Sequence, residues 1–150
     1  MRLVIQRVSS ACVTVDGTTI GQIGHGLCLL CGFTHGDDER IVEQMAAKCL
    51  NLRIFEDQDD KMNLSLADIK GAVLVVSQFT LYADCKKGRR PSFTDSADPV
   101  EAEELYQKFI GMLKTSGTEV QTGSFGAKML VDIQNDGPVT VVLDSAELGL

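Results

Sequence analysis

Three strand-like segments fill the start of the chain, and too little sequence separates them for a helix to intervene. Arg2 to Val8 and Ala11 to Val15 alternate apolar and polar residues, as in a strand with one covered face. Asp16-Gly17, a strong turn signal, then leads into Thr18 to Ile23. A parallel pair needs a crossover of about a dozen residues or more. The pattern therefore predicts antiparallel strands and disfavours a parallel doubly wound sheet.

A first helix is predicted after the apolar run Leu27 to Phe33. Asp37 or Asp38 can cap it by accepting hydrogen bonds from its first free amides. Its apolar positions recur at helical spacing, at Ile41, Val42, Met45, Ala46, Cys49 and Leu50. A short strand over Leu52 to Phe55 and a polar turn over Glu56 to Asp60 are expected next.

The clearest helix signal lies in the second half of the chain. Asp98 is a natural N-cap, Pro99 fits the first helical position, and Glu101 completes a capping box. Gly117 fits the position just beyond the last turn. The predicted buried stripe consists of Val100, Leu105, Tyr106, Phe109, Ile110 and Leu113.

The remaining segments predict further strands. Val73 to Ser77 is an almost continuous apolar run, typical of a central strand covered on both faces. Thr118 to Thr122 is another strand, and Ser124 to Ala127 a tight connection. Met129 to Gln134 and Val139 to Leu143 alternate around an Asp-Gly pair, which favours a final hairpin.

These elements predict an α+β fold: a curved, mainly antiparallel, barrel-like sheet with two main helices packed outside it, in a single domain over residues 1–150. No segment approaches the roughly 18 uninterrupted apolar residues of a membrane span. The opening Met1 to Arg7 lacks the apolar region of a signal peptide. Five cysteines at irregular spacings are expected to be thiols, which fits a cytoplasmic protein.

Cys28 and Cys31 have the spacing of a redox or metal-binding pair. Residues three apart on a strand point to opposite faces, so buried structural thiols are favoured, with a thiol oxidoreductase as the alternative. No second cysteine pair or histidine cluster completes a zinc site, and no metal or cofactor is predicted. His25 and His35 each adjoin glycine, which indicates turns.

The net charge of −7 opposes broad adhesion to nucleic acid. One local basic run, containing Lys86, Lys87, Arg89 and Arg90, could meet phosphates. From charge alone the run is more simply a solvated loop.

Two short motifs stand out. Residues 77–81, Ser-Gln-Phe-Thr-Leu, end the central strand with hydroxyls, a carboxamide and an aromatic ring, where sites often lie in buried sheets. Pro138 cannot donate to a sheet ladder and must lie at a strand start or edge, next to the conformationally free Gly137. Only about 5–6% of X-Pro bonds are cis, so local rules alone do not predict a cis bond here. Neither motif alone identifies a substrate.

Taken together, the motifs closely resemble the D-aminoacyl-tRNA deacylase family, of the Gly-cis-Pro class. The resemblance runs over almost the full chain and includes residues 1–8, 53–55, 61–64, 77–81, 90–93, 125–129 and 135–140. The visible departures are Tyr82 and the short tail from Asp144 to Leu150.

The resemblance implies hydrolysis of the ester that joins a D-amino acid, or glycine, to the terminal ribose of tRNA, while L-aminoacyl esters are spared. It implies a cytoplasmic homodimer without membrane association, with both active sites at the subunit interface. It also implies that a cis Gly137-Pro138 reaches into the partner's pocket, where an L side chain would clash. A non-catalytic module that binds RNA ends or proteins through the same pocket is the alternative.

Site residues follow from the same resemblance. The implied catalytic residues are Ser77, Gln78, Phe79 and Thr80. The implied substrate-binding residues and chirality filter are Gly137, Pro138, Met129 and Ala97, and the implied tRNA contacts are Lys86, Lys87, Arg89 and Arg90. Backbone amides near Phe79 and Thr80 are expected to stabilise the oxyanion, because an aminoacyl ester is already reactive and its ribose 2′-hydroxyl can share the proton movement. Thr80 is expected to position the substrate, with a role as nucleophile left open.

Overall fold

A computed structural model describes all 150 residues of the chain. Its main sheet has six strands in the order β2-β1-β3-β6-β7, with β8 paired to β1 as well. These strands are β1 (Arg2–Val15), β2 (Thr18–Ile23), β3 (Gly26–Gly32), β6 (Ala72–Ser77), β7 (Glu119–Thr122) and β8 (Leu130–Asp144). A small separate sheet pairs β4 (Phe55–Glu56) with β5 (Met62–Leu64), and the helices are α1 (Glu39–Leu50), α2 (Pro99–Thr115) and the short 3-10 helix η1 (Phe79–Tyr82).

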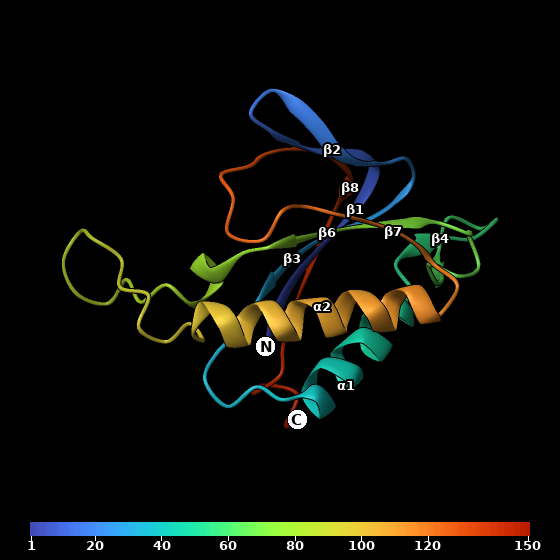
Figure 1. Ribbon diagram of the computed structural model, residues 1–150. Coiled ribbons are helices and arrows are strands. Elements are labelled where there is room, and N and C mark those ends of the chain that lie inside the picture. The colour runs from blue at the N-terminus through green and yellow to red at the C-terminus, as the bar shows by residue number, and fades with distance from the viewer.

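Both long helices lie on one side of the curved sheet (Figure 1). β1 pairs antiparallel with β2, β3 and β8, whereas β6 runs parallel to β3 and β7. β2 contacts β6 and β7, so the sheet nearly closes on itself. The predicted α+β fold with a barrel-like sheet and external helices is confirmed. The sheet is mixed because the chain segments that contain α1 and α2 supply the crossovers that parallel strands need.

β6 is the central strand that its apolar run predicts. Val73 and Val75 belong to the main core between sheet and helices, which also includes Tyr106 and Phe109 of α2. The Tyr106 hydroxyl donates to the Val75 carbonyl at 2.8 Å. The other face of β6 packs into a smaller cluster inside the curve of the sheet, made of Val8, Ala11, Val13, Ile23, Cys28, Ala72, Leu74 and Val76.

Two strand predictions are wrong. Arg2 to Val8 and Ala11 to Val15 form one strand rather than two, with register shifts near Ser9. The expected C-terminal hairpin is also a single strand, β8, and both of its halves pair antiparallel with β1. The reason is long range: β1 is long enough to pair with both halves, so they do not pair with each other. The Asp-Gly pair lies in a bulge instead of a hairpin turn.

The helix boundaries agree with the sequence, but two details differ. Asp38 caps α1 by accepting from the Ile41 amide at 2.8 Å, and Gly117 follows α2 with a φ of +83°. The Asp98 side chain makes no capping hydrogen bond, so the predicted capping box is absent. Val100 is 73% exposed instead of buried, because it lies on the opposite side of α2 from Phe109, whereas Ala102, two residues further along, lies on the buried side.

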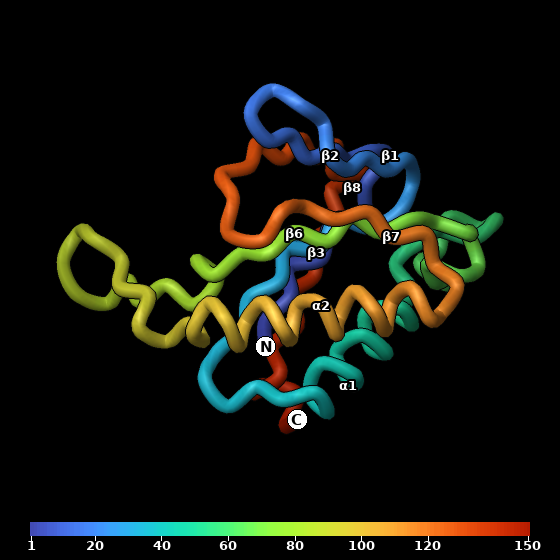
Figure 2. Tube along the Cα trace, in the orientation of Figure 1, coloured from blue at the N-terminus to red at the C-terminus, as the bar shows by residue number.

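Of the predicted strand over Leu52 to Phe55, only Phe55 belongs to a strand, because pairing with β5 begins there. No helix in the structure is long and apolar enough to span a membrane. The two ends of the chain lie close together (Figure 2), where the Ser145 amide donates to the Met1 carbonyl at 2.9 Å.

Candidate active site

A cavity of about 700 Å³ opens at the carboxyl end of β6, between the start of α2 and the connection from β7 to β8. Five of the predicted site residues line it: Ser77, Gln78, Phe79, Ala97 and Met129. The remaining predicted residues do not line it: Thr80, Gly137, Pro138, Lys86, Lys87, Arg89 and Arg90. The structure therefore brings the first motif to a cavity within one chain and leaves the Gly-Pro motif outside that cavity.

The end of β6 turns sharply into η1. The Gln78 amide donates to the Cys31 carbonyl at 2.7 Å, which extends the parallel ladder by one residue. Gly32 allows the turn to lie directly on the end of β3. A Cβ atom at Gly32 would lie 3.0 Å from the Gln78 carbonyl oxygen and 3.0 Å from the Leu81 Cβ, so any larger residue would push η1 away.

η1 displays the side chains of the first motif at the surface. Phe79 is 58% exposed and forms an edge-to-face pair with Phe93, with ring centroids 5.0 Å apart. The Gln78 carboxamide donates a hydrogen bond to the Thr80 hydroxyl. No carboxylate or imidazole hydrogen-bonds to Thr80 or Ser77. Neither hydroxyl therefore has a base in place to activate it as a nucleophile.

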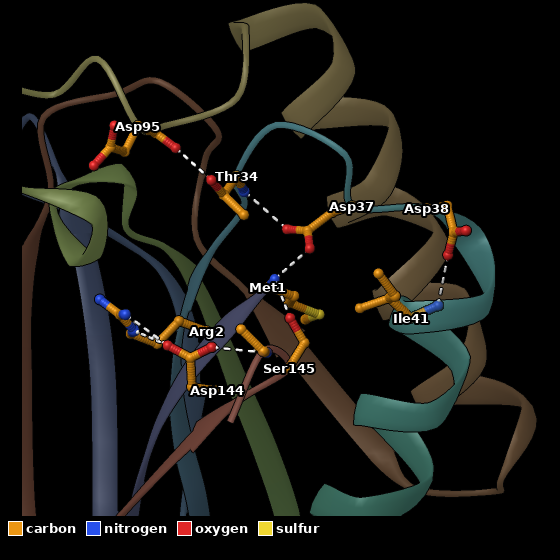
Figure 3. A network of polar contacts seen from close by, with 10 residues as sticks. Met1, Arg2, Thr34, Asp37, Asp38, Ile41, Asp95, Asp144 and Ser145 are labelled. Carbon is orange, nitrogen blue, oxygen red and sulfur yellow. Dashed lines mark hydrogen bonds and ion pairs between the residues drawn. The ribbon is translucent and has the colours of Figure 1, made fainter. Parts of the chain in front are cut away.

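The facing wall, residues 93–97, is tied to the segment after β3. The Ala97 amide donates to the Phe33 carbonyl at 3.0 Å, and the Thr34 hydroxyl donates to the Asp95 carbonyl at 2.5 Å. Thr34 in turn donates its amide to Asp37, which also accepts from the amine of Met1 (Figure 3). The wall is thus braced by Met1, the buried residue that precedes β1.

His35 also lines this cavity, with Nε2 3.1 Å from the Thr94 carbonyl oxygen. The sequence correctly indicates a turn at this histidine but gives no sign of its place in the wall. Phe93 and Phe125 line the cavity as well. Both belong to segments that carry the family resemblance, which is the one signal that could have pointed to them.

The Gly137-Pro138 peptide is cis and lies in a bulge of β8. The register passes from Gln6 opposite Thr140 to Val8 opposite Asn135, so residues 136–139 stand opposite Arg7 alone. Gly137 and Pro138 are exposed. Gly137 has a φ of +127°, a conformation that favours glycine.

Arg7 supports this bulge from inside the protein. It is only 4% exposed, and its Nε donates to the Asp136 carbonyl at 3.1 Å while Nη1 donates to the Ile54 carbonyl at 2.9 Å. The Asn135 side chain donates to the Arg7 carbonyl at 3.1 Å and to the Val139 carbonyl at 2.9 Å. These contacts fix both ends of the bulge, so its tip is a rigid exposed feature.

The predicted basic run forms an exposed loop that projects from the body of the protein (Figure 2). Asp84 and Ser92 close its base through reciprocal backbone hydrogen bonds of 2.7 and 2.9 Å. None of its four cations takes part in an ion pair, so all are available to phosphates.

Cys28 and Cys31 are both buried, and they belong to different clusters on opposite faces of β3. Burial raises the pKa of the Cys28 thiol to about 12 and that of Cys31 well above its ordinary value. Both groups are therefore protonated at neutral pH. This agrees with the predicted structural thiols and opposes a role in thiol redox chemistry.

Residues 4–144 match the sequence profile described as D-Tyr-tRNA(Tyr) deacylase. The chain therefore belongs to the D-Tyr-tRNA(Tyr) deacylase family.

Relatives of known name agree with this assignment. The chain is 58% identical over 147 residues to a D-aminoacyl-tRNA deacylase of Clostridioides difficile (strain 630), with 98% of this chain and 99% of the relative covered. It is 57% identical over 148 residues to the D-aminoacyl-tRNA deacylase of Thermomicrobium roseum, covering 99% of this chain and 96% of that protein.

Solved structures share the fold. A protein named c-Myc DNA Unwinding Element Binding Protein superposes with a TM-score of 0.91 and is 42% identical, with 96% of this chain and 98% of the other covered. A structure described as that of "a probable eukaryotic D-amino acid tRNA deacylase" superposes with a TM-score of 0.82 at 17% identity, over 95% of this chain and 97% of the other. The second likeness concerns the fold alone.

Proposed function

We propose that this protein hydrolyses the ester bond of D-aminoacyl-tRNA and releases the free D-amino acid and tRNA. The observation that carries the proposal is the cavity at the end of β6, which is lined by Ser77, Gln78 and Phe79 in a chain of the deacylase family. The close relatives named above are D-aminoacyl-tRNA deacylases. Glycyl-tRNA is a second expected substrate, because glycine carries no side chain that a steric filter could exclude.

The chemistry rests on positioning and on backbone donors. Main-chain amides near Phe79 and Thr80, at the start of η1, are the expected donors to the negative charge that develops on the ester carbonyl oxygen. The Thr80 hydroxyl is held by the Gln78 carboxamide, a donor that cannot remove its proton. Thr80 therefore acts as a positioning group, and water attacks the ester with help from the neighbouring ribose hydroxyl.

The chirality filter is proposed to come from a second copy of the chain. Gly137 and Pro138 are exposed on a braced bulge and do not line the cavity of their own chain. In a symmetric homodimer this bulge would enter the cavity of the partner. That cavity is lined by the proposed substrate-binding residues Ala97 and Met129. A backbone wall on one side of the substrate Cα would reject an L side chain by collision and leave a D side chain free.

Exposed apolar residues support such an assembly. Phe79 at the cavity, Val100 at the start of α2, and Leu130 and Val142 on β8 are all exposed. Burying such side chains against a second copy removes apolar surface from water, which favours association. Lys86, Lys87, Arg89 and Arg90 would then meet phosphates near the acceptor end, and the cytoplasm is the proposed location.

Incubation with D-tyrosyl-tRNA and L-tyrosyl-tRNA tests this function. Faster ester loss from the D form than in buffer, with the L form unaffected, is the expected result. A protein that binds both RNAs without accelerating ester loss from either would be the non-catalytic binding module, and the enzyme proposal would be rejected.

A further inference from the structure

We propose that Arg2 is a positioning residue that fixes η1, the turn that carries Phe79 and Thr80. Its guanidinium reaches from the first residue of β1 to the far end of this turn, where Nη1 donates to the Leu81 carbonyl at 2.6 Å. Arg2 does not line the cavity, so it acts on the reaction only through η1. The inference rests on the proposed deacylase function.

The guanidinium is itself held in place by Asp144. Nε and Nη2 donate to the same oxygen of Asp144 at 2.8 and 2.6 Å, and the two residues stand opposite each other in the pairing of β1 with β8 (Figure 3). The planar guanidinium can bind the carboxylate along one edge and still direct Nη1 at a carbonyl. Asp144 therefore sets the direction in which Arg2 points.

The Leu81 carbonyl needs a donor from outside its own turn. The last carbonyl groups of a short helix have no partner within it, and no backbone amide donates to this one. A cation at this end also complements the partial negative charge of the exposed carbonyls. Arg2 thus does for η1 what a C-terminal cap does for a longer helix.

Tyr82, the last residue of η1, provides a second contact. The guanidinium carbon of Arg2 lies 4.8 Å from the centroid of the Tyr82 ring, within the range of a cation–π interaction. Gly32, which stands opposite Arg2 in the pairing of β1 with β3, also lies close to Leu81 and Tyr82. η1 therefore rests on two neighbouring positions of the sheet, Arg2 of β1 and Gly32 of β3. Tyr82 and the tail that begins at Asp144 are also the two visible departures from the family pattern.

This arrangement predicts an effect on kcat rather than on KM. Ala97 and Met129, on other segments of the cavity wall, make no hydrogen bond with Arg2 and would bind the substrate as before. The amides of η1 act on charge that appears only in the transition state, so their misalignment slows the chemical step. Loosening the turn is expected to cost about tenfold in kcat, less than the roughly 100-fold that follows outright loss of an oxyanion donor.

The test compares wild type with Arg2→Met, Arg2→Lys and Asp144→Asn in deacylation of D-tyrosyl-tRNA, together with amide hydrogen exchange over residues 79–83. Arg2→Met should lower kcat about tenfold, leave KM within about twofold, and speed exchange in residues 79–83 but not in β6. Arg2→Lys should recover part of kcat, because an ammonium can still donate to Leu81. Arg40→Met, at an exposed arginine of α1, is the matched control and should match wild type.

An Arg2→Met enzyme with wild-type kcat and unchanged exchange would overturn the inference, as would a rise in KM alone. If Arg2→Met does not fold, Arg2→Lys and Asp144→Asn decide by the same two readouts. If the wild-type protein shows no D-specific deacylation, the proposed function fails. Faster exchange in residues 79–83 of the variants would still support the Arg2 contact in that case.

Discussion

The Nε atom of Arg7 lies 3.1 Å from the carbonyl oxygen of Asp136, so a buried guanidinium on β1 supports the residue that precedes Gly137. The same side chain donates to the Ile54 carbonyl. Arg7 thereby connects the bulge of β8 to the segment that leads into β4. The tip of the bulge can be exposed and still keep one shape, which is what a steric filter requires.

Arg7→Met is expected to weaken both stability and chiral selectivity. The Ile54 carbonyl would lose its donor, which costs about 1–3 kcal/mol in the free energy of unfolding for a buried group. The freed bulge would move, and the ratio of D- to L-tyrosyl-tRNA hydrolysis would fall. Denaturant titration and parallel rate assays measure the two effects. A folded variant with the wild-type D-to-L ratio would show that Arg7 does not support the filter.

Gly137→Ala should distort the bulge by direct collision. A Cβ atom there would lie 2.8 Å from the Val139 Cγ2 and 3.0 Å from the Arg7 Nη2, at a φ of +127°. Gly17→Ala is the matched control, because Gly17 also has a positive φ but nothing lies within 4 Å of its added Cβ. We expect a loss of D-to-L selectivity in deacylation assays for Gly137→Ala only. Equal selectivity in the two variants would argue against the proposed filter.

Replacing Lys86, Lys87 and Arg89 with Gln should raise KM for charged tRNA. Each phosphate contact that is lost removes about one unit from the slope of log affinity against log salt, so the salt dependence of KM should also flatten. A control with Gln at Lys48, Lys61 and Lys114 removes the same charge from exposed positions elsewhere. Measuring KM from low to moderate salt distinguishes the loop variant from this control variant. An unchanged salt dependence of KM in the loop variant would indicate that this loop is solvated and does not contact phosphates.

The lowered pKa of Asp144 predicts that this residue makes an acid-sensitive contribution to stability. Burial by itself raises the pKa of Asp144, but hydrogen bonds from Arg2 and from the Ala146 amide outweigh it and hold the pKa below the ordinary 3.8. A carboxyl group whose pKa is lower in the folded chain stabilises the fold above its unfolded pKa and loses that contribution as the pH falls through the folded value.

Asp144→Asn should therefore be less stable than wild type at neutral pH, and the two should converge as the pH falls well below 3.8. Unfolding midpoints measured across this range give the comparison. In an Arg2→Met background the effect of Asp144→Asn should shrink, because the two side chains share one contact. A stability difference that is constant with pH would exclude the carboxylate as its source.

Local sequence rules predict the elements whose boundaries depend on nearby residues. The limits of α2 follow from Pro99 and Gly117, and the two covered faces of β6 follow from its apolar run. The bulge at Gly137 could not be predicted in this way, because it depends on β1 pairing with both halves of β8. An Asp-Gly turn signal reports only the local backbone preference. It cannot reveal a distant partner, and Asp136 hydrogen-bonds to Arg7, more than 120 residues away in the sequence.

The candidate site also combines features that nearby residues predict with features that depend on distant contacts. The apolar run places residues 77–81 at a strand end, but only the family resemblance gives that strand end a substrate. His35 sits in the turn that its glycine neighbour predicts, yet its place in the cavity wall depends on contact with Thr94. The predicted stripe of α2 wrongly includes Val100: at about 3.6 residues per turn it lies on the opposite side of the helix from Phe109, and it is exposed.

A mixed dimer of two variants tests most directly the claim that each site combines the cavity of one subunit with the Gly-Pro bulge of the other. One variant carries Gln78→Ala and Thr80→Ala and should be inactive alone. The other carries Gly137→Ala and Pro138→Ala and should hydrolyse D- and L-tyrosyl-tRNA without selectivity. The purified mixed dimer contains one intact cavity facing one intact bulge, so it should hydrolyse D-tyrosyl-tRNA with the wild-type D-to-L ratio. A mixed dimer, verified by native mass spectrometry, that is inactive or unselective would contradict the account.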